Sequence, residues 1–326
     1  IGTPSQLPPL PPPTASPANM APPSANMTAT FNAPESPNTA PAFEPIVETP
    51  QPQPSPPPAA NPPETTSAYA LPGASTSPAP PSAAELSPKL EATKLKWAWP
   101  KVEQHVKDGK FRDALAELSP FANNPHLTPE DRAAVLRWLD ALAAKVIYGP
   151  EHYLSEAYRV TSNSQTLYEV AAAHKVPIQL LQNINSAVVK DPSVLLAGSE
   201  LKVIPGPFRA DLSLAAGELT LFVGPLYAGR FAFTVGEERP AAGTYRVQQK
   251  DLARTYIGRD GRQIAAGDVS NPYGNVWIDL GREVSLHGSA TNPVPGPALG
   301  CLSFSPQDAA DLYAILSKDS EVVIKP

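Results

Sequence analysis

Proline is concentrated in the first part of the chain, and this concentration limits the possible fold more than any other feature. The sequence has 326 residues and 43 prolines, and roughly 26 of those prolines lie before residue 91. The same stretch is rich in Ala, Ser, Thr, Asn and Gln and has few charged residues. Such a segment buries too little apolar surface to offset the entropy lost on ordering. We therefore expect residues 1–95 to form a disordered tether, in which runs such as 8–13 and 56–58 favour polyproline II.

Charge and hydropathy exclude several classes of protein. With 25 Lys and Arg against 31 Asp and Glu, the net charge is −6 and no basic block could neutralise a row of phosphates, so nucleic acid is not an expected partner. No apolar run approaches the roughly 18 residues of a membrane span. The chain does not begin with Met, so we expect the numbering to start after a removed or omitted N-terminal piece, and a signal peptide is neither visible nor excluded.

Between residues 96 and 150 the sequence changes to a helical pattern. Apolar residues repeat at three- and four-residue spacing, and Asp108-Gly109 interrupts them. Thr128-Pro129-Glu130-Asp131 has the composition of a helix start, with a hydroxyl cap, a proline in the first turn and acids at the positive end of the helix dipole. Gly149-Pro150 ends the pattern. We expect a small helical hairpin that resembles one tetratricopeptide unit and serves for packing or docking.

Residues 156–206 have the pattern of a separate small unit. A short strand at 158–160 precedes a helix from Thr166, a second helix over 176–185 and a closing turn and strand within 195–205. These residues resemble the LysM module, a strand–helix–helix–strand family that binds the N-acetylglucosamine backbone of peptidoglycan or chitin. The resemblance implies a shallow groove between the loops 161–166 and 184–196. The implied glycan-binding residues are Asn163, Gln165, Thr166 and Asn185.

A LysM fold that is kept only for packing is the alternative for this unit. The first loop of the family usually reads Pro-Gly-Asp-Thr-Leu. This chain has Asn163-Ser164-Gln165-Thr166-Leu167 instead, which lacks the glycine and the acid.

From residue 207 onward, short segments alternate between apolar and polar positions and are separated by glycine-containing turns. Three of them lie at 212–214, 219–223 and 231–235. Only one helix is expected, beginning at the capping sequence Ser305-Pro306-Gln307-Asp308, and 321–324 is expected to form a last strand. Residues 207–326 therefore predict a compact, mostly β domain with one helix near its C-terminus.

The only cysteine of the chain, Cys301, follows His287 by fourteen positions in this domain. The proline-rich loop between them is expected to be stiff and to bring the two side chains together. A free thiol has a pKa of about 8.5, so an imidazole that forms an ion pair with it would generate the nucleophilic thiolate. Gly300 leaves room for substrate and for N–H groups that face an oxyanion. From spacing alone, an unreactive core thiol is an equally good interpretation.

Several motifs in this domain resemble the L,D-transpeptidase (YkuD-type) family. The segments 287–289 (His-Gly-Ser) and 300–302 (Gly-Cys-Leu) are similar to the family's His-Gly-Thr/Ser and Ser-His-Gly-Cys-Ile-Arg/Asn signature. Residues 240–247 are similar to its Pro-Thr-Pro-x-Gly-x-Tyr/Phe stretch, and 271–278 to its Asn-Pro-x-Gly-x-x-Trp-Ile segment. The resemblance implies that a cysteine attacks the third residue of a tetrapeptide stem, usually meso-diaminopimelate, and releases D-alanine. The acyl group then passes to an amine of another stem, forming a 3→3 crosslink.

The resemblance also implies roles for single residues. Cys301 is the nucleophile, His287 is its base, and the carbonyl of Gly288 orients the imidazole. The residues expected to contact the oxyanion or the substrate are Gly300, Ser289, Ser303, Tyr273 and Trp277. For the two aromatic residues, core packing is an equally good explanation.

Three positions depart from the family signature. Ala298 stands where the family has serine, Leu299 where it has a second histidine, and Ser303 where it has Arg or Asn. Each change removes polar contacts near the thiol, and the loss of Arg matters most for substrate carboxylates or site geometry. Because the nucleophile and its base are kept, we expect an active cell-wall L,D-transpeptidase. A non-catalytic peptidoglycan-binding scaffold and a thiol L,D-carboxypeptidase are the alternatives.

Taken together, the sequence predicts a multidomain, exported protein of the bacterial envelope, in the periplasm or cell wall. Its expected partners are the glycan and stem peptides of peptidoglycan, and the resemblance implies that carbapenem-type inhibitors could acylate the thiol. No cofactor is expected. The four other histidines, at positions 105, 126, 152 and 174, lie outside the β domain without ligand spacing, so no metal is expected either.

Overall fold

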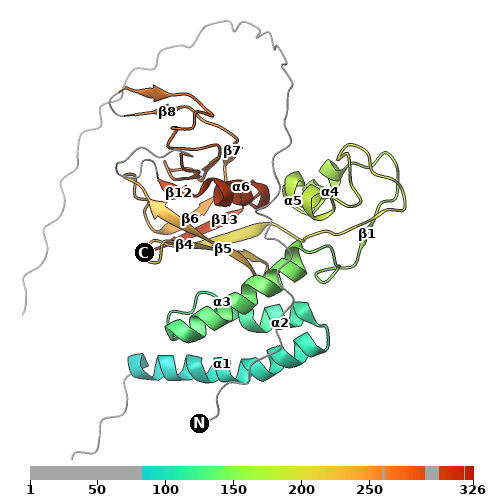
Figure 1. Cartoon of the computed structure of the whole chain (residues 1–326), viewed down its shortest axis with the longest axis vertical. Coiled ribbons are helices and arrows are strands. Elements are labelled where there is room, and N and C mark those ends of the chain that lie inside the picture. The colour runs from blue at the N-terminus through green and yellow to red at the C-terminus, as the bar shows by residue number, and fades with distance from the viewer. Residues whose placement is uncertain (1–82, 259–260, 291–300, 319) are drawn as a thin grey trace, which may run out of the picture. The chain divides into compact units, whose positions relative to one another are not determined.

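The computed structural model describes residues 83–258, 261–290, 301–318 and 320–326. Three helices come first and lie side by side, namely α1 (Ala83–Lys107), α2 (Phe111–Leu118) and α3 (Pro129–Ala143), as Figure 1 shows. The break between α1 and α2 falls at Gly109, whose φ is 72°. The Oγ1 atom of Thr128 accepts the backbone N–H of Asp131 at 3.1 Å, which confirms the predicted helix start. In the part of the chain that the structure covers, no helix is both long and apolar enough to cross a bilayer.

The predicted boundary of the N-terminal tether was wrong, because α1 begins at Ala83 rather than after residue 95. Residues 1–82 lie outside the described part of the chain. The segment 83–95 contains Pro88 but otherwise consists mostly of Ala, Glu, Leu and Lys, which have high helix propensity. Tertiary contacts add to this preference, since Leu95 is buried and Glu91 accepts a 2.8 Å hydrogen bond from Asn124.

A buried lysine joins the end of the helical segment to the next unit. After a 3₁₀ turn, η2 (Ser119–Phe121), and α3, the chain forms one π-helical turn, η3 (Ala144–Tyr148), and stops before Gly149 as predicted. Lys202 is 2% exposed and donates to the carbonyl oxygens of Val146 and Gly149. Desolvation lowers the pKa of Lys202 to about 8. The ammonium therefore satisfies carbonyls that the helix end leaves without partners.

The unit between residues 158 and 201 has the predicted order of strand, helix, helix and strand. Its elements are β1 (Tyr158–Arg159), α4 (Leu167–Ala173), α5 (Ile178–Ile184) and β2 (Glu200–Leu201), and the two strands pair antiparallel. Thr166 and Glu169 form a capping box at the start of α4. The second helix is shorter than predicted because Pro177, which fixes its own φ and lacks an N–H, occupies the N-cap position.

The C-terminal domain is built on one sheet of nine strands, which confirms the mostly β prediction. Their order is β6-β13-β3-β4-β5-β12-β11-β10-β7, with β13 parallel to β3 and β11 parallel to β12. The strands are β3 (Phe208–Ser213), β4 (Glu218–Val223), β5 (Leu226–Val235), β6 (Gly243–Arg246), β7 (Gln249–Asp251), β10 (Trp277–Asp279), β11 (Ser285–His287), β12 (Leu302–Phe304) and β13 (Glu321–Lys325).

The remaining elements of this domain are a small hairpin and one helix. The hairpin consists of β8 (Tyr256–Ile257) and β9 (Gln263–Ile264), which pair only with each other. The predicted helix is present as α6 (Pro306–Ile315), and the hydroxyl of Ser305 caps it by accepting the N–H of Asp308 at 3.1 Å. Cores of this kind, with one helix against a sheet, position loops at the strand ends for binding or chemistry.

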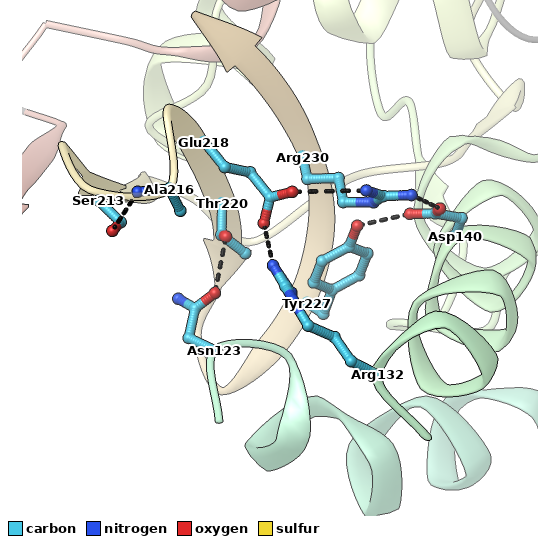
Figure 2. Close-up of polar contacts among 9 residues, drawn as sticks. All are labelled: Asn123, Arg132, Asp140, Ser213, Ala216, Glu218, Thr220, Tyr227 and Arg230. Atoms are coloured by element: carbon cyan, nitrogen blue, oxygen red, sulfur yellow. Dashed lines mark hydrogen bonds and ion pairs between the residues drawn. The ribbon is translucent and has the colours of Figure 1, made fainter. Parts of the chain in front are cut away.

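Polar contacts fix the helices against strands β4 and β5 of the sheet. Figure 2 shows that Tyr227 of β5 donates to Asp140 of α3, and that Arg230 reaches both Asp140, at 3.3 Å, and Glu218 of β4, at 3.4 Å. Glu218 also pairs with Arg132 of α3 at 2.7 Å. Beneath these contacts β4 is buried along nearly its whole length. The helical segment therefore covers part of the sheet that carries the candidate site.

Candidate active site

His287 and Cys301 belong to two neighbouring strands of the sheet. Strand β11 ends at His287 and pairs in parallel with β12, so that His287 lies opposite Ser303. Cys301 directly precedes β12, two residues before Ser303. With strands about 4.8 Å apart and a two-residue rise of about 6.6 Å, the Cα atoms of His287 and Cys301 are about 8 Å apart, within reach of an imidazole and a thiol. The fold thus brings the two predicted residues into one region of the sheet.

The hydrogen bond of His287 to the next residue determines where its ring proton lies. The Nδ1 atom is 2.6 Å from the carbonyl oxygen of Gly288, which can only accept, so Nδ1 carries the proton in the neutral ring. The Nε2 atom is buried and has no hydrogen-bond partner among the described residues. Burial lowers the pKa of His287 to about 4. At neutral pH the ring is therefore uncharged and presents an unused lone pair on Nε2.

Ser303 donates to the same carbonyl that orients the imidazole. Its Oγ atom lies 3.3 Å from the Gly288 oxygen. The carbonyl therefore has two donors, the ring N–H of His287 and the Ser303 hydroxyl, which matches its two lone pairs. The hydroxyl of Ser303 is thus used by the backbone next to His287, and its predicted oxyanion or substrate role stays a prediction.

Two aromatic residues surround the His287 ring. Trp277 stacks on the imidazole with ring centroids 5.8 Å apart and an angle of 16° between the planes. Tyr273 meets His287 at 5.3 Å and Trp277 at 4.5 Å, both edge to face. Trp277 is buried while Tyr273 is half-buried, so the tyrosine forms the more accessible part of this wall. The pair excludes water from the ring, which is the cause of its lowered pKa.

The loop that carries Tyr273 is held by Asn271, which is fully buried. The amide of Asn271 donates to the carbonyls of Arg254 at 2.8 Å and Ala265 at 2.9 Å, and its oxygen accepts the N–H of Tyr273 at 2.9 Å. The next residue, Gly274, has a φ of 59°, and a Cβ there would lie 2.7 Å from the carbonyl oxygen of Ser289. This Asn-Pro-Tyr-Gly segment therefore packs directly against the backbone that follows His287. Ser289 contributes backbone to this packing.

The thiol is buried and protonated in this structure. Cys301 is 1% exposed. Burial raises the pKa of its thiol, a backbone hydrogen bond from Ser285 lowers it, and the Glu238 carboxylate raises it further. Because the pKa of the imidazole is lowered and that of the thiol raised, the resting pair is neutral. Desolvation of both groups thus favours a neutral resting pair over the expected thiolate–imidazolium ion pair.

Several predicted residues of this site fall on positions that the structure does not describe. Gly300, Ala298 and Leu299 lie within 291–300, together with most of the proline-rich loop before the cysteine. The predicted oxyanion role of the Gly300 backbone and the effect of the two departures from the signature stay predictions. Within the described residues, His, Cys, Asp and Glu side chains form no group of three that could hold a metal.

The structure does not bring the four glycan-binding candidates together. Asn185 is 5% exposed, and its amide is used within the unit by the backbones of Leu181 and Lys202, so the expectation that it faces a glycan was wrong. Thr166 caps α4, and Gln165 is held by Tyr158 and Thr161. Only Asn163 links the two loops, by accepting the N–H of Ala197 at 2.6 Å.

A hollow of about 230 Å³ does lie in this unit, but it belongs to the second loop. Its lining residues are Val188–Asp191, Val194–Leu196, Ser199 and Leu201, and the large apolar side chains of Val188, Val194 and Leu196 are more than half exposed. None of the candidates from the first loop lines it. The shallow groove between the two loops therefore stays a prediction from the resemblance.

Sequence reasoning missed three residues near His287 and Cys301. Asn271 was noted only as part of a motif, and Glu238 and Arg254 were not singled out. Glu238 is exposed, yet its charge acts on both Cys301 and Tyr273. The guanidinium carbon of Arg254 lies 4.5 Å from the centroid of Trp277. Both charges approach the site through tertiary contacts, so no local pattern in the sequence could have found them.

Comparison with known proteins gives matches to solved structures only. No model of a known protein family matches this chain. No curated protein matches it either. An L,D-transpeptidase from Mycobacterium tuberculosis H37Rv matches at 18% identity over 41% of this chain and 64% of its own, with a TM-score of 0.30. L,D-transpeptidase 3 from M. tuberculosis with a faropenem-derived adduct matches at 17% identity over 41% and 66%, with a TM-score of 0.30.

A third solved structure belongs to a protein with another description. It is a fused Zn-dependent amidase/peptidase/peptidoglycan-binding domain-containing protein from Clostridium acetobutylicum. It matches at 17% identity over 53% of this chain and 66% of its own, with a TM-score of 0.29. The match to the first M. tuberculosis enzyme spans less than two thirds of that enzyme's length. The function proposed below therefore rests on the residues of the site.

Proposed function

We propose that this chain is a cysteine acyltransferase that acts on peptidoglycan stem peptides, as an L,D-transpeptidase does. One observation carries the proposal: the Nε2 atom of His287 is buried without a hydrogen-bond partner among the described residues, on the strand next to the one that Cys301 directly precedes. A buried polar atom without a partner costs free energy, so its position calls for a function. A general base that receives the thiol proton is the function that fits this ring nitrogen.

The neutral resting pair defines the order of proton transfers. As the sulfur attacks the stem carbonyl, the thiol proton moves to Nε2 and the S–C bond forms. The tetrahedral intermediate collapses when Nε2–H returns this proton to the leaving D-alanine amine, and a thioester remains. An acceptor amine then attacks the thioester and gives its proton to Nε2. The sulfur leaves as thiolate, takes that proton back, and the neutral pair is restored.

The surroundings of His287 support a transient positive charge on the ring. When Nε2 is protonated, the Gly288 carbonyl accepts a charge-assisted hydrogen bond from Nδ1 at the distance of 2.6 Å that already exists. The face of Trp277 lies against the ring and stabilises a cation by its quadrupole. Both interactions strengthen as the charge develops, which is the property that lowers an activation barrier.

The other parts of the chain fit a role in the cell envelope. We propose that residues 156–206 bind the glycan backbone of peptidoglycan and that the protein works in the periplasm or cell wall. The support is the LysM resemblance and the strand–helix–helix–strand order of the unit. Joining a glycan binder to an acyltransferase raises the local concentration of stems around the thiol.

A second candidate function is favoured by the burial of the sulfur. Cys301 is 1% exposed and the pKa of its thiol is raised, as in an inert core cysteine. A peptidoglycan-binding scaffold without catalysis would have these properties. In that case the protein would bind wall material while Cys301 stayed unmodified by any stem peptide.

Incubation of the full chain with purified disaccharide-tetrapeptide muropeptides tests the proposal. The expected products are a thioester on Cys301, found by mass spectrometry of peptides, and crosslinked muropeptide dimers. Cys301→Ala is expected to abolish both, and His287→Gln to slow acylation by a factor on the order of 10² to 10⁴. Tripeptide products without dimers would indicate hydrolytic trimming instead. Bound muropeptide with no thioester would support the scaffold.

A further inference from the structure

Arg254 lies beside the candidate site and has no acidic partner among the residues that the structure describes. Among the residues that the structure describes, no carboxylate lies within ion-pair distance of its guanidinium, although ten ion pairs occur elsewhere in that part of the chain. The guanidinium carbon instead lies 4.5 Å from the Trp277 ring centroid, and its side chain is exposed. Stacking on an aromatic face leaves the N–H edge of a guanidinium free to bind an anion.

The position of Arg254 is built by the same residue that builds the site. The buried amide of Asn271 donates to the backbone carbonyl of Arg254 at 2.8 Å while its oxygen holds the N–H of Tyr273 at 2.9 Å. Trp277, on which Arg254 stacks, is itself stacked on His287. The backbone of Arg254 is thus held by the buried amide of Asn271, and its side chain is connected to His287 through the indole of Trp277.

The charges near Tyr273 are of opposite sign. The Glu238 carboxylate raises the pKa of Tyr273 and the Arg254 guanidinium lowers it, so both charges act on this one side chain. Glu238 also acts on the thiol of Cys301, whereas Arg254 does not.

We propose that Arg254 is a specificity-determining residue that binds the free side-chain carboxylate of the third residue of the donor stem, on the Trp277 side of the candidate site. This inference rests on the proposed function for the identity of the peptide. Arg254 would also supply the positive charge that the family signature has two residues after the cysteine. In this chain Ser303 occupies that position, and its hydroxyl donates to the Gly288 carbonyl. A planar guanidinium can donate two parallel N–H···O bonds to a carboxylate, which an amide in the same place cannot match.

The test compares two stems that differ only in one group. The donor muropeptides are identical except that the side-chain carboxylate of the third residue is free in one and amidated in the other. Their dissociation constants are measured by calorimetry with the full chain carrying Cys301→Ala, so that no chemistry is needed. The free acid is expected to bind on the order of tenfold to a hundredfold more tightly. Arg254→Gln is expected to reduce this ratio to about one, and Arg254→Lys to keep part of it.

Arg282→Gln is the matched control, because Arg282 is also exposed and stacks on an aromatic ring, that of Tyr245, at 5.7 Å. It lies in the turn at the other end of the β10–β11 pair from His287. The control is expected to keep the ratio of the parent chain. A ratio that does not depend on Arg254, an equal loss of both stems in Arg254→Gln, or no binding of either stem would overturn the inference. If one of these outcomes occurs while wild-type Cys301 is acylated, the inference about Arg254 fails and the proposed function stands. If the ratio depends on Arg254 as expected but wild-type Cys301 is not acylated, the proposed function fails and the binding role of Arg254 stands.

Discussion

The indole of Trp277 stacks on the imidazole of His287 at a centroid distance of 5.8 Å, with only 16° between the two planes. Strand pairing produces this contact, because Trp277 and His287 are register partners on β10 and β11. One pair of facing residues therefore both buries the ring and provides a surface that stabilises its cation. The consequences of this arrangement can be measured.

The first prediction concerns the pH dependence of folding. The pKa of His287 is lowered from 6.5 to about 4 in the folded state, so the folded chain binds this proton more weakly than the unfolded chain. The contribution of the neutral His287 ring to the free energy of unfolding is complete above pH 6.5 and is lost as the pH falls toward 4. Between pH 7 and pH 5 the free energy of unfolding should fall by about 2 kcal/mol from this group. Urea unfolding at a series of pH values measures it.

His287→Gln should remove this part of the pH dependence, because glutamine does not titrate. His152→Gln, at an exposed position, is the control and should keep the wild-type curve. Identical pH curves for wild type and His287→Gln would show that the ring is not held neutral by burial.

The second prediction concerns the reactivity of Cys301 with iodoacetamide. The pKa of the thiol is raised by burial and by the Glu238 carboxylate. The alkylation rate should therefore keep rising with pH beyond the normal thiol pKa of about 8.5, without a plateau at acidic pH. Mass spectrometry of the modified peptide follows the rate. A plateau between pH 5 and pH 7 would instead reveal a thiolate–imidazolium pair.

The third prediction concerns the close packing of Gly274 on the backbone after His287. Its φ is 59°, and an added Cβ would lie 2.7 Å from the Ser289 carbonyl oxygen and 3.0 Å from the Ser289 nitrogen. Gly274→Ala should lower the free energy of unfolding by about 3 kcal/mol or more, the sum of backbone strain and the displacement of the 288–289 segment. It should also lower the rate of Cys301 acylation.

Gly267→Ala is the control that measures the cost of backbone strain alone. Its φ is 81°, and nothing lies within 4 Å of an added Cβ. A loss of about 1 kcal/mol is expected there. Equal losses for the two alanine variants would mean that the contact with Ser289 does not matter.

The fourth prediction concerns the contact between the helices and the sheet in Figure 2. The Tyr227 hydroxyl donates to the carboxylate of Asp140, which is 43% exposed as a side chain. A double-mutant cycle with Tyr227→Phe and Asp140→Ala should give a coupling free energy of about 1 kcal/mol, the value for a hydrogen bond to a partly screened charge. Chemical unfolding of the four chains gives the result. A coupling near zero would show that the Tyr227–Asp140 hydrogen bond does not stabilise the contact between α3 and β5.

Local patterns in the sequence were sufficient to predict most elements of the fold. The cap at Thr128, the cap at Ser305 and the alternation in 212–235 depend on neighbours in the chain, and each was confirmed. The start of α1 could not be placed, because Leu95 and Glu91 are held by residues from a later segment. In this segment, helix propensity and tertiary packing determined where α1 begins more than the density of prolines did.

The proximity of His287 and Cys301 could be predicted from the sequence, and their electrostatics could not. The types and spacing of His287 and Cys301 pointed to a nucleophile and a base, and the strand register places them on neighbouring strands. Their protonation states depend on burial by Trp277 and Tyr273, which only the folded chain provides. The same holds for Asn185, a polar loop residue by sequence that the fold buries and fully satisfies.

The most direct test of the central claim is peptide mass spectrometry of the wild-type chain after incubation with a tetrapeptide-stem muropeptide. The account predicts that the peptide containing Cys301 gains the mass of the stem less its terminal D-alanine, and that His287→Gln suppresses this adduct. An unmodified Cys301 in a folded chain that binds the muropeptide would contradict it.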